Sequence, residues 1–271
     1  FLVSEAPEAW GTTGRTWTVK LLDKCTVLDQ DKILAAYALD AGTVVTTAIV
    51  TLIESTGETN HAITPSAATL VNPLAWSAGT TKLQIVTDLL SVMNSFSLCA
   101  NGDGQYRGEP YVKPANRPTV WEFLDGDNCI YDPTFGKDVD LFAIPNTFIA
   151  ITQGDGDTAA LTSTAINDDP ASPYSTVSRG RTIAADPAVG VEVADQATLD
   201  AFTVRRLIEL TAPTASVEIA HAFVPDLAFN RAVRFRRVPA AIDGRHVVSK
   251  TETSLDPTML AKSTLTEVVD L

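Results

Sequence analysis

The sequence has few of the residues from which catalytic and metal sites are usually built, with three cysteines and three histidines in 271 residues. Cys25, Cys99 and Cys129 form no CxxC pair, so we expect neither a disulfide framework nor a zinc site. The odd number leaves at least one thiol unpaired within the chain, which suits assembly in a reducing cytoplasm. No run of about 18 apolar residues could span a bilayer, and the chain does not open with the charged segment of a signal peptide. We therefore expect a soluble protein with buried thiols.

The sequence also lacks an excess of positive charge. It has 33 acidic and 20 basic residues, which give a formal net charge of -13. Because phosphate binding needs an electropositive surface, this balance argues against direct recognition of nucleic acid. A hydrophobic content of 45% and a charged content of 20% are typical of globular proteins. The length suits one large domain or two small ones, and we favour two.

Periodicity and capping residues predict the helices and strands. Apolar residues recur at helical spacing after Thr43, and Thr81 with Gln84 forms a capping box. A third helix begins at Asp195, a good N-cap, and ends before Pro213. In chain order the predicted elements are a strand within 15–28, a helix over 43–53, a loop over 60–77, a helix over 81–93, a hairpin of 96–100 and 105–112, strands 119–123 and 146–153, a partner strand at 158–166, a helix over 195–211, and strands 215–222, 232–237, 245–252 and 263–269.

Two features of the second half bear on its architecture. The close spacing of the last four strands favours an antiparallel barrel or sandwich. The stretch 167–193 is rich in proline and small residues, and we interpret it as an assembly arm that docks on neighbouring subunits.

Hydrolytic chemistry has little support in the sequence. A serine hydrolase needs a serine on a sharp elbow with a histidine and an acid, yet no G-x-S-x-G is present. His221 alternates with apolar residues in a predicted strand, where a hydrogen-bonded structural histidine is the commoner explanation. Glu109 and Glu122 lie on predicted strands and could supply the two carboxylates of a glycosidase, but nothing separates them from the other acidic residues.

Metal and cofactor sites are equally weakly indicated. Clusters of Asp, Asn and Gly at 101–104, 125–128 and 155–157 have the oxygen ligands that Ca²⁺ prefers. None has the EF-hand spacing, because Gly136 stands where the loop that begins at Asp125 needs a glutamate, and plain turns explain all three. No phosphate-binding or Rossmann glycine pattern occurs. We expect no cofactor, no metal ion and no catalytic residue.

One basic patch stands out in this acidic chain. It consists of Arg231, Arg234, Arg236 and Arg237, with Arg245 and His246 expected on a neighbouring strand. Arginine pairs with carboxylates through two parallel hydrogen bonds and is suited to interfaces. We predict a contact between subunits here, with a merely solvated face as the alternative.

Several segments resemble minor tail proteins of bacteriophages that infect actinobacteria. They are Gly14-Arg15-Thr16-Trp17 through Leu22-Asp23-Lys24, the run from Leu28 to Lys32, Gly154 to Thr158, Asn167 to Tyr174, and the ending Thr253 to Leu271. The order of elements, with a helix and hairpin over 81–112, a strand at 146, a helix at 195 and then a series of strands, resembles the tail-hub proteins of phage baseplates. The resemblance covers nearly the whole chain and transfers no functional residue.

The resemblance implies a non-enzymatic virion protein at the tail tip, assembled in the bacterial host cytoplasm. Its expected fold is α+β and β-rich, with hub-type antiparallel β-barrel domains and a few helices packed on them. Such a hub forms a trimeric ring that closes the tail tube and anchors fibre or needle proteins. The expected partners are copies of the chain itself, the distal tail protein, the tape measure and fibres.

The expected domains are residues 1–30, the remainder of an upstream barrel, then a helix–helix–hairpin domain over 31–145 and a strand–loop–helix–barrel domain over 146–271. The chain begins at Phe1 without Met, so we expect it to be part of a longer gene product. Two alternatives stay open, a tail-associated peptidoglycan hydrolase and a carbohydrate-binding receptor module. The latter needs exposed aromatic platforms, and we expect most of Trp10, Trp17, Trp76 and Trp121 to lie in the core.

Overall fold

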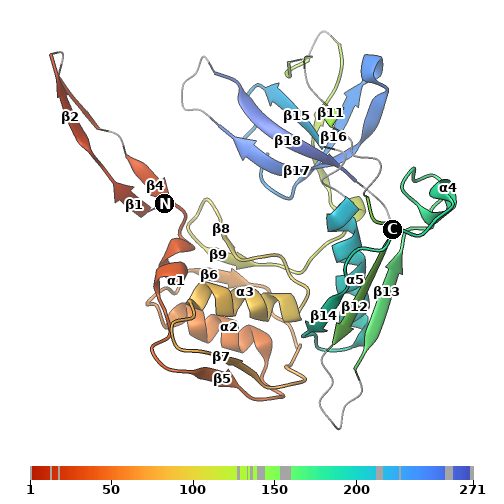
Figure 1. Ribbon diagram of the computed structural model, residues 1–271. Coiled ribbons are helices and arrows are strands. Elements are labelled where there is room, and N and C mark those ends of the chain that lie inside the picture. The colour runs from red at the N-terminus through yellow and green to blue at the C-terminus, as the bar shows by residue number, and fades with distance from the viewer. Residues whose placement is uncertain are drawn as a thin grey trace. The chain divides into compact units, whose positions relative to one another are not determined.

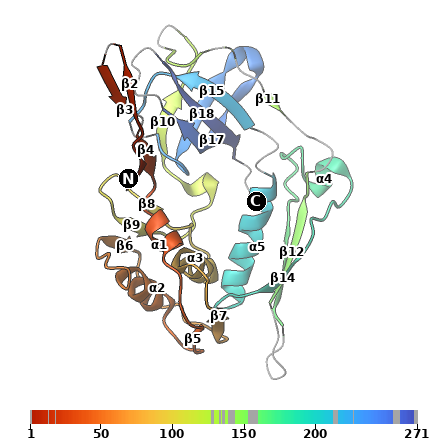
Figure 2. The same ribbon diagram turned by 60° about the vertical axis from the view of Figure 1, so that its left-hand side comes forward.

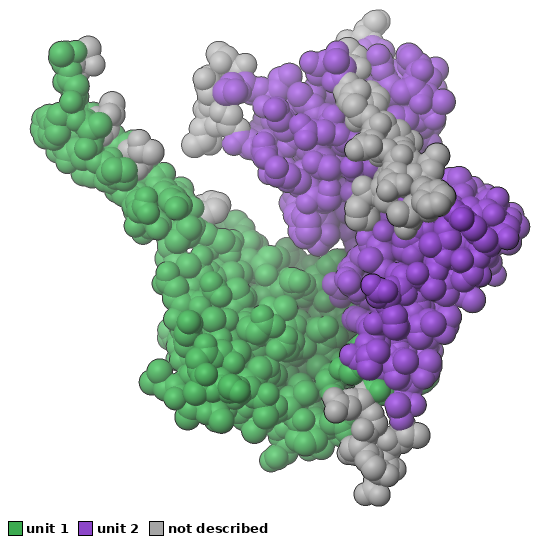
Figure 3. All heavy atoms as spheres, in the orientation of Figure 1, with its two compact units in different colours: residues 1–111, 152–154, 190–199 green, residues 112–151, 155–189, 200–271 purple. Residues whose placement is uncertain are grey.

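Buried hydrophobic side chains gather in two separate clusters, and the chain divides around them into two units (Figure 3). Unit 1 comprises Phe1–Tyr111, Thr152–Gly154 and Gly190–Leu199, and unit 2 comprises Val112–Ile151, Asp155–Val189 and Asp200–Leu271. The computed structural model describes residues 2–12, 14–17, 19–126, 129–132, 134, 137–138, 144–152, 160–211, 216–225, 227–253 and 259–268.

The N-terminal residues form a ribbon with two antiparallel sides. The outgoing side contains β1 (Leu2–Glu5) and β2 (Glu8–Gly11), and the returning side contains β3 (Gly14–Trp17) and β4 (Lys20–Leu22). β1 pairs with β4 and β2 pairs with β3, both antiparallel, so the chain turns between Gly11 and Gly14 and returns beside itself. Gly14 has a φ of 135°, which would strain any other residue. The ribbon projects from the rest of unit 1 (Figure 1), and we call residues 2–22 the N-terminal ribbon.

The strand predicted within 15–28 is wrong in its last third, because the chain becomes helical there. α1 spans Thr26–Gln30. Asp23 causes the change, since its carboxylate accepts a hydrogen bond from the main-chain nitrogen of Cys25 at 2.7 Å and its carbonyl accepts one from Thr26 at 3.1 Å. An aspartate that bonds to nearby main-chain nitrogens in this way favours a turn over a strand.

Unit 1 is built on two amphipathic helices that pack against each other (Figure 2). They are α2 (Val45–Glu54) and α3 (Lys82–Val92), both as predicted. The side chain of Thr81 accepts a hydrogen bond from the nitrogen of Gln84 at 3.1 Å, which confirms the predicted cap. Gly57 follows α2 with a φ of 86°, a left-handed conformation that often terminates a helix.

Short strands surround these helices. They are β5 (Tyr37–Leu39), β6 (His61–Ile63), β7 (Leu74–Trp76), β8 (Cys99–Ala100) and β9 (Tyr106–Gly108), arranged as a β5-β7 pair and a sheet of order β6-β9-β8. β8 and β9 confirm the predicted hairpin. The segment predicted as a loop over 60–77 contains two of the strands, β6 and β7.

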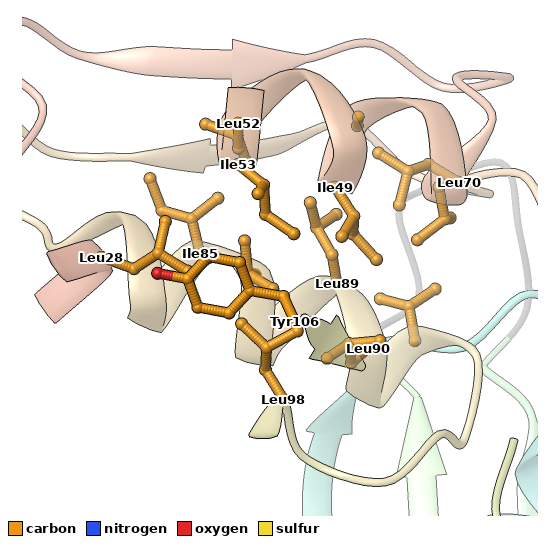
Figure 4. Close-up of a cluster of buried hydrophobic side chains, with 14 residues drawn as sticks. Leu28, Ile49, Leu52, Ile53, Leu70, Ile85, Leu89, Leu90, Leu98 and Tyr106 are labelled. Carbon is orange, nitrogen blue, oxygen red and sulfur yellow. The ribbon is translucent and has the colours of Figure 1, made fainter. Parts of the chain in front are cut away.

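The core of unit 1 is formed mainly by aliphatic side chains from both helices (Figure 4). Its fully buried members include Leu28, Ile49, Ile53, Ile85 and Leu89. Burying an aliphatic side chain of this size stabilises a fold by roughly 1.5–3 kcal/mol. This core therefore supplies the rigid base from which the ribbon extends.

A small sheet and a long helix are formed mainly by residues of unit 2, with Thr152, the end of β14 and the first turn of the helix counted in unit 1. β12 (Thr147–Thr152) lies between β13 (Thr162–Ile166) and β14 (Ala188–Val191), and α5 spans Gln196–Thr211. The carboxylate of Asp195 accepts a hydrogen bond from the nitrogen of Thr198 at 2.7 Å, as expected for a cap. The acidic turn at 155–157 and the first residues of the predicted strand 158–166 lie outside the described residues.

The stretch 167–193, which we predicted to be an irregular assembly arm, has some regular structure, and its docking on neighbours stays a prediction. It contains α4 (Thr176–Arg179) and β14, and it folds back on β12. The fully buried side chain of Asn146 holds it, accepting a hydrogen bond from the nitrogen of Ile183 at 2.7 Å and donating one to the carbonyl of Arg181 at 2.9 Å. A buried asparagine that satisfies main-chain groups can order a segment without regular periodicity.

The second part of unit 2 is a six-stranded sheet of order β10-β16-β17-β18-β15-β11. The strands are β10 (Thr119–Phe123), β11 (Lys137–Asp138), β15 (Ser216–His221), β16 (Ala232–Arg237), β17 (Ile242–Glu252) and β18 (Ala261–Glu267). All four strands predicted at the C-terminal end are present. Two turns of 3-10 helix among the described residues, η1 (Pro114–Asn116) and η3 (Val238–Ala240), flank β10 and β16.

The fold is α+β and β-rich, as the sequence predicts. The predicted antiparallel barrel differs in detail, because β10 runs parallel to β16 while the other neighbours are antiparallel. Over the described part of the chain the strand order is open, with β10 and β11 at its edges.

Aromatic rings fill the inner face of the six-stranded sheet. Tyr131 lies between two phenylalanines, with ring centres 6.2 Å from Phe123 and 5.3 Å from Phe235. The ring centres of His221 and Phe123 are 5.1 Å apart, and those of His246 and Phe235 are 5.7 Å apart. Edge-to-face and tilted contacts of this kind add about 0.5–1.5 kcal/mol each beyond the area buried. The predicted strands therefore share one aromatic core.

Candidate assembly surfaces

Two of the four predicted interface arginines lie together on an exposed sheet face. Along β16, Val233 and Phe235 are buried, while Arg234 and Arg236 are exposed. In the register with β17, Arg234 lies opposite Arg245 and Arg236 lies opposite Asp243. The strict alternation of the strand therefore places these side chains on the outer face of the sheet.

This face brings three arginines close to the carboxylates of Asp243 and Glu122. Asp243 accepts hydrogen bonds from Nε and Nη2 of Arg234 at 3.1 and 3.3 Å, and its carboxylate is also 3.8 Å from Nε of Arg236. Arg245 stands directly opposite Arg234, and like charges in that position destabilise a sheet. The Asp243 carboxylate thus lies close to two guanidinium groups, those of Arg234 and Arg236, and Arg245 lies opposite Arg234. We call Arg234, Arg236 and Arg245 the arginine face.

The other two predicted arginines have different surroundings. Arg231 is exposed at the residue before β16. Arg237 donates from Nη1 to Oδ1 of Asp125 at 2.9 Å, and the same carboxylate accepts hydrogen bonds from the Tyr131 hydroxyl at 2.9 Å and the Val238 nitrogen at 2.5 Å. The bond from Arg237 lowers the pKa of Asp125, and burial raises the pKa of Tyr131. Arg237 therefore fixes the segment after β10 to the end of β16, and it contributes to the fold more than to an open surface.

The expectation that most of the four tryptophans lie in the core is wrong, because Trp10, Trp17 and Trp121 are exposed, and the N-terminal ribbon presents two of them. Trp10 is 77% exposed and Trp17 is 52% exposed. Trp10 pairs with Arg15 and Trp17 with Glu8, so all four side chains share one face of the ribbon. The guanidinium carbon of Arg15 lies 5.5 Å from the ring centre of Trp10 and 5.0 Å from that of Trp17, and Arg15 is 3.2 Å from the Glu8 carboxylate.

The signal for this surface was present in the sequence but incomplete. Alternation predicted a strand through Trp17, yet a single strand does not reveal whether its apolar side meets a core. Only the pairing with residues 8–11 shows that the ribbon has two strands, and the four residues of both β1 and β2 are exposed. Such a two-stranded ribbon buries little apolar surface by itself.

Charge separates the two sides of the ribbon. The outgoing side, residues 2–11, carries Glu5 and Glu8 and no basic residue, while the returning side, residues 14–22, carries Arg15 and Lys20 and no acidic residue. Among the described residues neither side has a further strand as neighbour. One edge of the ribbon is therefore acidic and the other is basic.

The candidate catalytic residues have structural partners. His221 is 1% exposed, with Nε2 2.9 Å from the Ser263 hydroxyl and Nδ1 2.7 Å from the Ala222 carbonyl, and burial lowers its pKa. Glu109 forms an ion pair with Arg107, and Glu122 lies on exposed β10 beside Arg234. The burial and hydrogen bonds of His221 agree with the predicted structural histidine.

The polar turn at 101–104 is an ordinary hairpin turn. Oδ1 of Asn101 accepts hydrogen bonds from the nitrogens of Asp103 at 3.0 Å and Gln105 at 2.9 Å, which uses the oxygen that a cation would need. Across the described ranges there is no group of three or more His, Cys, Asp or Glu side chains that could hold a metal ion. In the same ranges, no helix has the length and apolar character needed to cross a membrane.

The described residues form a β-rich α+β fold. No known protein-family profile matches the sequence, and no curated protein matches it. Solved structures of tail proteins share its fold. A tail protein from Neisseria meningitidis MC58 is 12% identical with a TM-score of 0.70, and the match covers 98% of this chain and 79% of that protein.

Two further structures are similar. The 43 kDa tail protein of prophage MuSo2 from Shewanella oneidensis is 13% identical with a TM-score of 0.67, covering 98% of this chain and 78% of that one. A prophage tail protein from Listeria monocytogenes EGD-e is 13% identical with a TM-score of 0.52, covering 98% and 76%. The chain therefore has the fold of these tail proteins over nearly its whole length.

Proposed function

We propose that this chain is a non-enzymatic structural protein of a bacteriophage tail, in a phage that infects actinobacteria. The observation that carries the proposal is the likeness of fold to tail proteins over 98% of the chain. It agrees with the resemblance found in the sequence itself. The proposed location is the tail tip of the virion, after assembly in the host cytoplasm.

Within the tail, we assign the chain to the hub, a ring of three copies that closes the tube and anchors fibre or needle proteins. The N-terminal ribbon, proposed as part of a barrel over residues 1–30, supports a ring. Within one ribbon Glu8 forms an ion pair with Arg15 and Glu5 lies opposite Lys20, and an acidic edge beside the basic edge of the next copy would extend this pattern of opposite charges across each junction. Pairing of like edges would place acid against acid. Head-to-tail contacts of this kind close into rings when the rotation permits.

The arginine face supports contacts with other tail proteins. Asp243 is the described carboxylate partner of both Arg234 and Arg236, and Arg245 donates to the Ala115 carbonyl. An acidic surface on a neighbouring distal tail protein, tape measure or fibre would complete their pairing.

The direct test is to find the chain in particles. Mass spectrometry of purified virions should detect the protein, and gold-labelled antibodies should mark the tail tip in electron micrographs. Native mass spectrometry of the purified protein should give three copies per assembly. Absence of the protein from washed virions would contradict the structural role, and a monomer at all concentrations would contradict the ring alone.

A carbohydrate-binding receptor module is the second candidate, and the exposure of Trp10 and Trp17 favours it. Two aromatic rings beside the Arg15–Glu8 ion pair could stack on a sugar and bond to its hydroxyls. Binding of soluble cell-wall polysaccharide to the wild-type protein but not to a Trp10→Ala and Trp17→Ala variant would support this candidate. Unchanged binding, or none, would reject it.

A further inference from the structure

Lys24 and Cys25 follow the N-terminal ribbon directly, and we call them the ribbon base. They lie against the β8–β9 hairpin, which is distant in the sequence. Nζ of Lys24 donates to the carbonyl of Gly104 at 2.9 Å, and the Tyr106 hydroxyl donates to the carbonyl of Lys24 at 3.0 Å. The next residue, Cys25, has its Sγ 3.9 Å from the carbonyl oxygen of Leu98. The residue that follows Leu98 is Cys99, so this packing brings two cysteines to the same place.

Peptide geometry limits how far apart they are. The Cα of Cys99 lies about 2.8 Å from the Leu98 oxygen, so Sγ of Cys25 is within roughly 7 Å of that Cα. Disulfides join Cα atoms roughly 4.4–6.8 Å apart. Because the bound above runs from a sulfur to a Cα, forming the bond requires both side chains to rotate and the segment Lys24–Cys25 to move toward β8. The effect of the Cys99 thiol on the pKa of Cys25 agrees with two neighbouring groups. Both thiols are reachable, because Cys99 is exposed and Cys25 is partly exposed.

The electrostatic surroundings keep both thiols protonated near neutral pH. Burial raises the pKa of Cys25 to about 12, and the Asp23 carboxylate and the Cys99 thiol add to this effect. Burial also raises the pKa of Cys99, against the lowering effect of Arg107. Because the thiolate is the reacting species, these raised pKa values slow exchange near neutral pH, and a higher pH speeds it.

We propose that Cys25 and Cys99 are an oxidisable pair that forms a disulfide once the protein leaves the reducing cell, and that this bond fastens the ribbon to the β8–β9 hairpin. The proposal rests on the proposed function, because a virion protein passes from the cytoplasm to the medium at lysis. The bond would close a loop containing α1, α2 and α3, which restrains the unfolded chain.

The co-reactant is a low-molecular-weight disulfide. One cysteine, as thiolate, attacks it and releases one small thiol, which leaves a mixed disulfide on the protein. The second cysteine then attacks the protein sulfur of that bond and releases the second small thiol. The two protons lost by the cysteines end on the two released thiols, so the protein is oxidised by two electrons and the small disulfide is reduced by two.

The test uses the full chain, purified in reductant and then incubated with oxidised glutathione at about pH 7 and about pH 9. Remaining thiols are alkylated, and the digested protein is mapped by mass spectrometry. We expect a peptide that links Cys25 to Cys99, formed faster at the higher pH, and a higher unfolding midpoint that reductant reverses. Cys129 should stay alkylated, and Cys129→Ser should oxidise like wild type.

The variants Cys25→Ser and Cys99→Ser should form no such link and should stop at the mixed disulfide with glutathione. The mapping of the wild-type chain decides the matter even if a variant folds poorly. Glutathione adducts without a link, a link through Cys129, or links only between chains would overturn the proposal. The outcome is independent of whether virions contain the protein, so failure here is distinguishable from failure of the proposed function.

Discussion

The Tyr106 hydroxyl donates a hydrogen bond to the carbonyl of Lys24 at 3.0 Å, while Nζ of Lys24 lies 4.7 Å from the centre of the Tyr106 ring. The two residues thus make two contacts, one between the Tyr106 hydroxyl and the Lys24 carbonyl and one between the Tyr106 ring and the Lys24 ammonium group. Lys24 belongs to the ribbon base, and Tyr106 belongs to the core of unit 1. Nζ also forms an ion pair with Glu58 at 2.5 Å. This pair of residues is the best-defined link between the ribbon and its unit.

Replacing Tyr106 by Phe should therefore loosen the ribbon. The change removes only the hydroxyl, so we expect a loss of about 0.5–1.5 kcal/mol from the free energy of unfolding. Trypsin should cleave at Lys20 and Lys24 faster than in wild type, as followed by mass spectrometry. Tyr37→Phe is the control, because it also removes one hydroxyl but keeps the ring contact of residue 37 with Trp76. Equal cleavage rates in the two variants would show that the bond does not hold the ribbon.

Leu89→Ala should cost about 2–5 kcal/mol of stability, because Leu89 is fully buried and its removal leaves a cavity between α2 and α3. Urea unfolding measures the loss. Leu34→Ala is the matched control, since Leu34 is 96% exposed and its truncation should change stability by less than about 0.5 kcal/mol. Similar effects at both positions would contradict the assigned core.

Asp125→Asn should lower the thermal midpoint of unit 2, because a neutral amide weakens the bonds from Arg237 and Tyr131. Asp243→Asn is the control, because Asp243 lies on an exposed face and also has arginine partners. Its effect on the midpoint should be smaller. The reverse order of effects would show that the Asp125 contacts do not stabilise the end of β16.

Asp125 should also contribute to acid sensitivity. The hydrogen bond from Arg237 holds its folded-state pKa below the ordinary value of an aspartate, so the stabilisation is present above that ordinary value and is lost as pH falls through the folded-state pKa. Urea midpoints measured across the acidic range should fall less steeply for Asp125→Asn than for wild type. Parallel curves would remove Asp125 from the acid transition.

His221 should produce a separate loss at milder pH. Burial lowers its folded-state pKa below 6.5, so the unfolded chain takes up the proton first, and stability declines as pH falls below 6.5. Its ring instead stays neutral and bonded to Ser263 in the fold. His221→Asn should reduce the difference between the urea midpoints at about pH 7.5 and about pH 5.5. An undiminished difference would mean that another group titrates.

Sequence patterns predicted the elements whose signals are local. α2 and α3 follow from helical spacing with a cap at Thr81, and the β8–β9 hairpin follows from a turn of Asn, Gly and Asp between two strands. β15 to β18 follow from alternation. In each case the residues that determine the element lie within or next to it, so no tertiary contact had to be known.

Features that depend on distant partners were missed. β10 was predicted as a strand, but its parallel pairing with β16 depends on residues more than one hundred positions later. The segment 167–193 has no periodicity because the side chain of Asn146 orders it from outside. Trp10 and Trp17 alternate like core residues, yet the ribbon face on which they lie is exposed to solvent.

The candidate site was predicted in part for the same reason. The arginine patch was visible as composition, and β16 places Arg234 and Arg236 on one face because strands alternate. The different place of Arg237 depends on Asp125, a residue from the segment after β10. Whether a charged residue faces outward or binds the fold is a question of partners, which composition does not contain.

The parallel pairing of β10 with β16 sets an order of events during synthesis. Phe123 is synthesised before its neighbour Phe235 and the rest of β16, which follow it by more than one hundred residues. Until then a large aromatic side chain and an unpaired strand edge stay open to water and to other nascent chains. A polypeptide that stops before residue 232 lacks β16 and leaves this edge of β10 uncovered, so it would be prone to aggregate.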